Sequence, residues 1–145
     1  MAIDRQGTGL VVTRVCLGVF LLFQGLGKYE WFADTSILAG RFQEWLDAVA
    51  PGSISRWYLD HIALPGLSMF ARLVPLGEIA SGVALIVGFY TPIFAFISFF
   101  MVLNFAVASG LIFNYSYLTN GYGLPVLGST LGLAVGGVRL PWSVR

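Results

Sequence analysis

Charged residues are scarce in this chain of 145 residues, and this scarcity excludes most soluble folds. Only 10% of the residues are charged, whereas 57% are hydrophobic and 15% aromatic, and the mean hydropathy is +0.83. So few charges cannot cover the surface of a soluble domain of this length. The eight Lys and Arg residues are scattered, while phosphate binding needs a clustered basic face. We therefore expect no nucleic-acid partner.

Cysteine and histidine each occur once, which limits the redox chemistry available within the chain. Cys16 alone cannot form an internal disulfide, a CxxC pair or a cysteine-ligated iron–sulfur cluster, and we interpret it as a packing residue. His61 lies outside every apolar run, so a bis-histidine haem cannot be built from this chain. Because His61 follows Asp60 in a predicted surface helix, we interpret it as a solvated residue. The alternative is that it takes part in a proton relay on the outer face. We expect no metal site and no intrinsic cofactor.

Long apolar runs take the place of charge, and they predict transmembrane helices. A helix needs about 20 apolar residues to cross the hydrocarbon core of a bilayer. The runs predict four spans, at about residues 10–30, 70–89, 92–113 and 122–140. The first is predicted to be an uncleaved span and not a signal peptide, because no small-x-small cleavage site follows it. The predicted fold class is all-α, a membrane-embedded four-helix bundle that forms one domain over residues 1–145.

The segment between the first two spans, at about residues 33–64, is predicted to be an amphipathic extracytoplasmic insertion. Phe42, Trp45, Leu46 and Val49 fall at helical spacing, opposite a charged face. A second short surface helix follows before the chain turns into the membrane. This insertion is the one sizeable element that we expect outside the bilayer.

The distribution of charge over the loops predicts that both termini are cytoplasmic. Four spans place the termini on one side, which carries four basic residues against one acid. The opposite side carries four basic residues, five acids and His61. Because cytoplasmic loops are enriched in Lys and Arg, we expect a multi-pass protein of the bacterial inner (cell) membrane with the insertion outside.

Each predicted span carries a polar side chain at a similar depth, and these side chains form the candidate ligand-binding site. Counting ~1.5 Å per residue places them roughly 8 to 14 Å below the outer surface. The set consists of Gln24, Glu78, Asn104, Ser129 and Thr130, with Lys28 just above. Glu78 is the first candidate, because ionisable groups within a membrane are costly and Lys28 can keep its carboxylate ionised.

Structural roles for the same residues stay open at this stage. The Lys28 and Glu78 side chains could simply hold two helices together. The amides and hydroxyls of Gln24, Asn104 and Ser129 are also of the kind that often join helices inside a bundle. The sequence identifies no catalytic residue.

Glycines at helical spacing predict close contacts between helices. Gly18 and Gly25 lie on a stripe of the first span, bounded by Arg14 and Lys28, that should face the bundle. Arg14 itself lies near the inner headgroups and is interpreted as snorkelling to phosphate. The last span carries a double small-xxx-small repeat, whose partner is a helix of this chain or of a neighbouring subunit. That repeat consists of Gly128, Gly132 and Gly136.

Three stretches of the chain resemble the DoxX/DoxD family of integral membrane proteins. They are RVCLGVFLLFQGLGK in the first span, FARLVPLGEIASGVALIVGFYTP across the second and MVLNFAVASG in the third. The residues that carry the resemblance are Arg14, Gly18, Phe20, Gly25, Lys28, Gly77, Glu78, Gly82, Gly88 and Asn104. DoxD is known as the small subunit of thiosulfate:quinone oxidoreductase, and the long insertion resembles DoxD more than a minimal DoxX protein.

The resemblance implies a place in a membrane redox system that exchanges electrons with the quinone pool. Because the chain lacks metal ligands and thiol pairs, we expect an accessory or structural subunit of a larger membrane complex, with membrane lipids and a redox partner subunit as its partners. The alternative is a quinone-binding catalytic small subunit of a thiosulfate:quinone-type oxidoreductase. In that case an aromatic rim would receive the quinone above the polar layer. The predicted rim consists of Trp31, Tyr115, Tyr117 and Tyr122.

A small transporter is a third class of function for a chain of this kind. It predicts a discontinuous helix or an internal repeat, and neither is evident in the sequence.

Overall fold

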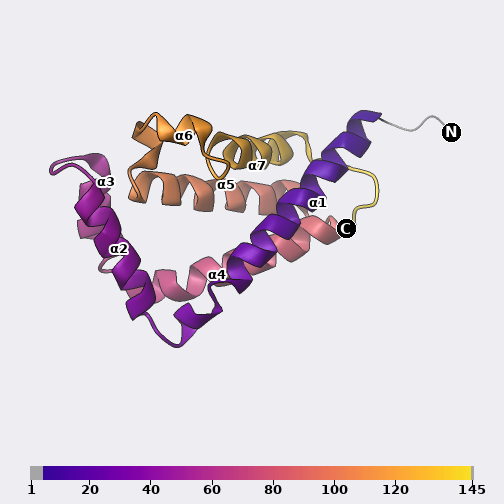
Figure 1. The fold of residues 1–145 in the computed structure, drawn as a ribbon. Coiled ribbons are helices and arrows are strands. Elements are labelled where there is room, and N and C mark those ends of the chain that lie inside the picture. The colour runs from indigo at the N-terminus through magenta and orange to yellow at the C-terminus, as the bar shows by residue number, and fades with distance from the viewer. Residues whose placement is uncertain (1–4, 145) are drawn as a thin grey trace.

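The computed structural model describes residues 5–144, and regular structure in that range is entirely helical. The main helices are α1 (Arg5–Leu26), α4 (Leu67–Val87), α5 (Thr91–Ala108) and α7 (Leu124–Gly136). The shorter elements are η1 (Tyr29–Phe32), α2 (Ser36–Ala48), α3 (Ile54–Tyr58), η2 (Leu59–Ala63), η3 (Leu111–Phe113) and α6 (Ser116–Thr119). The start of α1 and the segment that follows α7 lie toward one end of the molecule, and α2, α3 and α6 lie toward the other (Figure 1).

Within the described residues, α1, α4 and α5 are long and apolar enough to cross a membrane. They have 22, 21 and 18 residues, and the shortest therefore extends ~27 Å along its axis. Helix α7 is apolar but has 13 residues, or ~20 Å. It ends at Gly136, four residues before the predicted end of the last span. Two adjacent glycines, Gly136 and Gly137, account for the early end, because glycine is a poor helix former.

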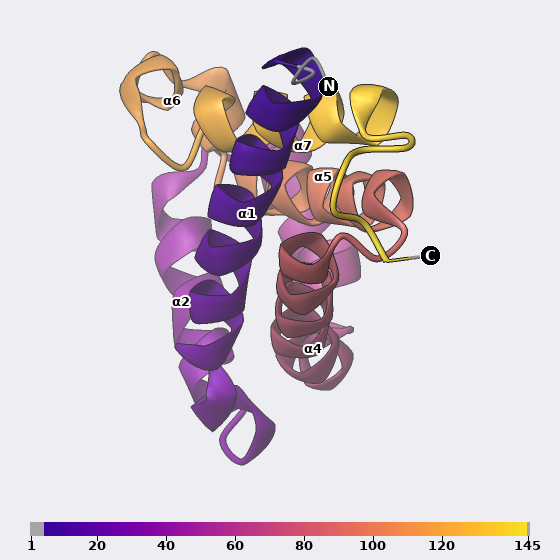
Figure 2. The ribbon, with the colours of Figure 1, turned by 90° about the vertical axis from the view of Figure 1, so that its right-hand side faces the viewer.

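Helices α1 and α4 lie side by side (Figure 2), and their backbones approach closely at glycines. A Cβ atom built on Gly18 would lie 2.8 Å from the carbonyl oxygen of Gly82. One built on Gly25 would lie 2.9 Å from the carbonyl oxygen of Pro75, and one on Gly82 would lie 2.6 Å from the amide nitrogen of Leu22. Backbone atoms cannot move aside as a flexible side chain can, so this close approach requires glycine at all three positions.

The glycines of α7 make no such contact within residues 5–144. Positions Gly128 and Gly132 have nothing within 4 Å of a Cβ atom, and a Cβ atom on Gly136 would meet only Leu10 at 3.6 Å. The sequence left two partners open for this repeat, a helix of the same chain or one of a neighbouring subunit. Within the described residues, no helix of this chain packs against Gly128 or Gly132. Their side of α7 is available to another molecule.

The insertion packs its apolar side on the ends of α4 and α5. In Figure 1, α2 runs across that end of the molecule. Phe42, Leu46 and Val49, three residues of the predicted apolar face, are each at least 92% buried and belong to one cluster with Ala71 of α4 and Ala108 of α5. The apolar face of α2 thus contacts protein, and the insertion closes one end of the helical assembly.

Arg14 is buried and holds the C-terminal segment, which corrects the expectation that it snorkels to lipid phosphate. The side chain is 2% exposed, its Nη1 donates to Ser143 Oγ at 2.7 Å, and its Nη2 donates to the Trp142 carbonyl at 3.0 Å. A buried guanidinium needs acceptors, and the returning chain supplies two of them, while Nε has no partner among the described residues. Cys16 is exposed and not packed inside. Two residues after Arg14, it points ~200° away around the helix.

The α1–α4 contact predicts a different response to the same substitution at two glycines. Gly82→Ala should lower the free energy of unfolding by about 1–3 kcal/mol, because the added methyl group forces the two backbones apart. Gly132→Ala, in open space, should leave it unchanged or raise it by up to about 1 kcal/mol through helix propensity. Thermal unfolding of the purified chain in detergent measures both. Equal midpoints for the two variants would contradict the contact.

Candidate functional site

An open cavity of about 600 Å³ is lined by α1, η1, α2, α5, the connection between α5 and α7, and the first turn of α7. Helix α4 contributes one residue, Glu78. This volume is typical of small-molecule sites. The residues that line it are Phe20, Leu21, Gln24, Gly27, Lys28, Glu30, Trp31, Ile37, Arg41, Trp45, Glu78, Val102, Phe105, Ala106, Ser109, Leu111, Tyr117, Asn120, Tyr122, Gly123 and Val126.

A buried ion pair between Lys28 and Glu78 lies in the wall of this cavity. Lys28 Nζ is 2.7 Å from each carboxylate oxygen of Glu78. The two side chains are 17% and 7% exposed. Lys28 follows the end of α1, where the helix unwinds, and Glu78 is on the face of α4 that packs on α1. Each charge is thus compensated where neither is well solvated, which is the condition for keeping ions in a protein interior.

Further groups surround the Lys28 ammonium. Nζ lies 3.3 Å from the carbonyl oxygen of Gln24 and 3.5 Å from its side-chain oxygen. It also lies 5.8 Å from the ring centre of Trp31 and 5.7 Å from that of Phe105. Aromatic faces attract cations at these distances. Because the contacts to Gln24 are long, the ammonium can still donate to an incoming oxygen atom.

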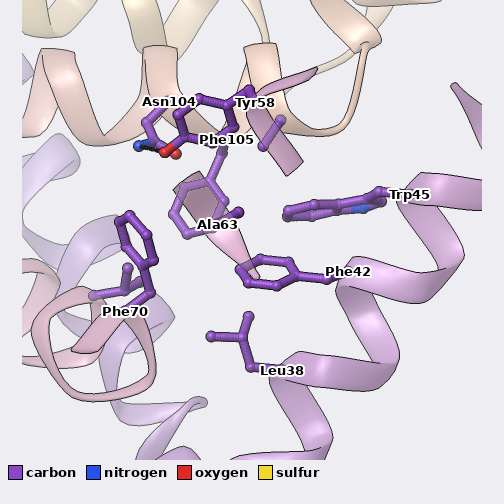
Figure 3. Close-up of a pocket in the computed structure, with 10 residues that line it drawn as sticks. Leu38, Phe42, Trp45, Tyr58, Ala63, Phe70, Asn104 and Phe105 are labelled. Carbon is purple, nitrogen blue, oxygen red and sulfur yellow. Dashed lines mark hydrogen bonds between the residues drawn. The ribbon is translucent and has the colours of Figure 1, made fainter. Parts of the chain in front are cut away.

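Asn104 faces a different and much smaller pocket, of about 20 Å³. Its Nδ2 donates to the hydroxyl of Tyr58 at 2.7 Å, which joins α5 to α3 (Figure 3). Trp45 and Phe105 line both the pocket and the 600 Å³ cavity, and their rings meet edge to face with centres 6.2 Å apart. Asn104 therefore lies beside the candidate site and not in it.

Ser129 and Thr130 also lie outside the cavity. Ser129 Oγ donates to the carbonyl of Pro125 at 2.6 Å, and Thr130 Oγ1 donates to that of Leu127 at 2.8 Å. Hydroxyls in helices commonly satisfy themselves in this way. Of the six predicted ligand-binding residues, the structure brings three into the cavity, and these are Gln24, Lys28 and Glu78.

The aromatic rim is only partly the predicted one. Trp31, Tyr117 and Tyr122 line the cavity, whereas Tyr115 is 81% exposed and does not. The sequence analysis did not include Trp45, Phe105 or Phe20 in the site. These come from helices distant in the chain, and Phe20 meets the ring of Tyr122 at 5.5 Å between centres. Helical spacing identified Trp45 as apolar-facing, but nothing in the sequence indicated what it faces.

His61 lies away from both hollows, stacked on Trp57 with ring centres 5.2 Å apart and Nδ1 2.9 Å from the carbonyl oxygen of Trp57. Among residues 5–144, no group of three His, Cys, Asp or Glu side chains is arranged to hold a metal ion. Ionic chemistry at the cavity therefore centres on Lys28 and Glu78, with Glu30 and Arg41 also in its lining.

Comparison with known protein families gives a match to DoxX over residues 9–111. The matched range includes most of α1, the whole insertion, α4 and α5, and hence every charged side chain that lines the cavity. It ends before α6 and α7. No curated protein gives a significant match to the chain, and no solved structure does.

The buried pair predicts a large loss of stability when one charge is removed alone. Lys28→Met should lower the free energy of unfolding by about 3–5 kcal/mol, because Glu78 is left without its cation. Adding Glu78→Gln should recover part of this loss, since no charge then remains. Glu44→Gln, which breaks the exposed Arg41–Glu44 pair, should cost less than about 1 kcal/mol. Unfolding midpoints measured in detergent test this prediction. A double variant that is no more stable than Lys28→Met would count against the pairing.

Proposed function

The chain belongs to the DoxX family, integral membrane proteins of redox-related function, and from that premise we propose that it is the quinone-binding subunit of a membrane redox complex. The observation that supports this proposal is the 600 Å³ cavity, which combines aromatic walls with the buried Lys28–Glu78 pair. Other subunits of the complex would exchange electrons with the bound quinone.

A quinone fits the chemistry of this cavity. Its flat ring can lie against aromatic side chains, here Trp31, Trp45 and Phe105, and its apolar tail can extend toward lipid. Its carbonyl oxygens accept hydrogen bonds, and the Lys28 ammonium donates a charge-assisted one. Reduction of a quinone to a quinol takes up two protons with two electrons. Glu78, bonded to Lys28, would take up protons and relay them through Lys28 toward the same carbonyl.

The electrons have to come from a partner subunit, because one cysteine and one histidine offer no internal redox centre. A catalytic small subunit of a thiosulfate:quinone-type oxidoreductase would work in this way. The second candidate is an accessory or structural subunit, and the open side of α7 favours it. Gly128 and Gly132 allow close approach of a helix from another subunit, and Val135 beside them is 76% exposed.

The proposed topology has α7 as a fourth, short crossing and both termini in the cytoplasm of a bacterial cell. Two observations support it: the insertion and α6 lie at the opposite end of the molecule from the termini, and the loops carry the charge asymmetry described above (Figure 1). A helix of ~20 Å can cross where neighbouring residues or local thinning of the bilayer compensate.

Quinone binding is tested by fluorescence. A short-tailed quinone should quench the tryptophan emission of the purified chain saturably, because Trp31 and Trp45 line the cavity. Glu78→Gln, which keeps the side-chain shape, should weaken binding at least about tenfold and lower the quinone that co-purifies, since Lys28 loses the charge that orients it. Asp60→Asn, which breaks the exposed Arg56–Asp60 pair outside the cavity, is the matched control. Unchanged affinity and quinone content in Glu78→Gln would end the proposal.

Orientation is tested by cysteine labelling in a Cys16→Ser background. A membrane-impermeant thiol reagent applied to intact cells should label Gly121→Cys, whose position between α6 and α7 is open. It should reach Val138→Cys, 62% exposed at the other end of α7, only after the membrane is permeabilised. The reverse pattern would place the termini outside, and labelling of both in intact cells would remove the fourth crossing.

A further inference from the structure

The side-chain amide of Gln24 carries an unpaired hydrogen-bond donor in the wall of the 600 Å³ cavity. Gln24 lines the cavity, and its Oε1 lies 3.5 Å from Lys28 Nζ. Because an ammonium only donates, the oxygen of the amide is the atom that faces it, and the nitrogen is left for other partners. Within residues 5–144, Nε2 forms no hydrogen bond. Nor is it one of the unpaired polar atoms buried in that range, so a ligand can reach it.

The measured contact places this donor beside the Lys28 ammonium. The oxygen and nitrogen of a primary amide are ~2.2 Å apart, so Gln24 Nε2 lies within about 6 Å of Lys28 Nζ. The two residues are four positions apart at the C-terminal end of α1, and both line the cavity. The cavity thus has two neighbouring donors in one wall, and both can bind one ligand when its acceptors are neighbours as well.

The other neutral polar side chains of the cavity come from elements that follow α4 in the chain. They are Ser109, Tyr117, Asn120 and Tyr122, and none of them contacts the Lys28 ammonium in the described part of the chain. Tyr117 Oη is also fully buried, so a ligand in the cavity does not reach it. Gln24 is therefore the neutral donor whose distance from Lys28 allows both to act on one end of a ligand.

We propose that Gln24 Nε2 donates to a second oxygen of the quinone, carried by the ring carbon next to the carbonyl that Lys28 binds. This inference rests on the proposed function and narrows its ligand class to quinones with an alkoxy or hydroxyl oxygen beside a carbonyl. Two such oxygens lie about 3 Å apart, close to the length of one hydrogen bond, so donors in one wall can bind both. The second carbonyl of a para-quinone is on the opposite edge of the ring and points away from this wall.

The test compares two quinones by calorimetry of the full chain in detergent. 2,3-Dimethoxy-5,6-dimethyl-1,4-benzoquinone has an oxygen beside each carbonyl, and tetramethyl-1,4-benzoquinone has methyl groups at all four positions. The unmodified chain should bind the dimethoxy quinone about 3- to 10-fold more tightly, the usual effect of one hydrogen bond. Gln24→Met, similar in shape but without the amide, should abolish this difference and change the affinity for the tetramethyl quinone less than about 2-fold. Gln43→Met, the same change at an exposed residue outside the cavity, should keep the difference.

The outcomes separate this inference from the proposed function. If the unmodified chain binds neither quinone, the quinone proposal fails and this inference fails with it. If the unmodified chain binds both with equal affinity, the quinone proposal stands and the inference is wrong, a check that needs no variant. If Gln24→Met weakens both quinones equally, Gln24 only positions Lys28, and the inference is wrong. A preference for the dimethoxy quinone that persists in Gln24→Met, or in Gln24→Leu should the first variant not fold, would also overturn it.

Discussion

Two opposite charges among apolar helices have to compensate each other, and Lys28 and Glu78 do so at 2.7 Å. The pair is possible because α1 and α4 touch at Gly18, Gly25 and Gly82, so that a lysine at the end of one helix reaches a carboxylate in the middle of the other. With larger residues in this contact, the helices would separate and both charges would need other partners. The candidate site thus depends on a close backbone contact over residues 18–25 of α1.

The two ends of α1 use a buried cation in different ways. Lys28 is paired with a carboxylate and faces a cavity. Arg14 is bonded to neutral acceptors, a hydroxyl and a carbonyl of the returning C-terminal segment. Arg14 therefore fastens the chain at one end of the molecule, while the insertion closes the other.

The matched family range and the rest of the chain contribute different parts of the cavity. Residues 9–111 supply its charged groups, whereas Tyr117, Asn120 and Tyr122 come from the connection that follows this range. In the proposed function, the matched range provides the ionic pair that binds one carbonyl and exchanges protons. The connection between α5 and α7 adds aromatic side chains to the wall of the cavity.

The class of protein, the helical fold and the central pair were predictable from the sequence, because they depend on local properties. Runs of apolar residues identify membrane spans by their length. Because charged residues are rare in and near these spans, Glu78 and Lys28 are conspicuous in the sequence. The membership of the site was not predictable to the same extent. Counting residues gives the depth of a side chain along a helix, but the direction in which it points depends on how the helices cross. Asn104 bonds Tyr58, Ser129 and Thr130 bond their own helix, and Tyr117 is buried, because packing set the rotation of each element.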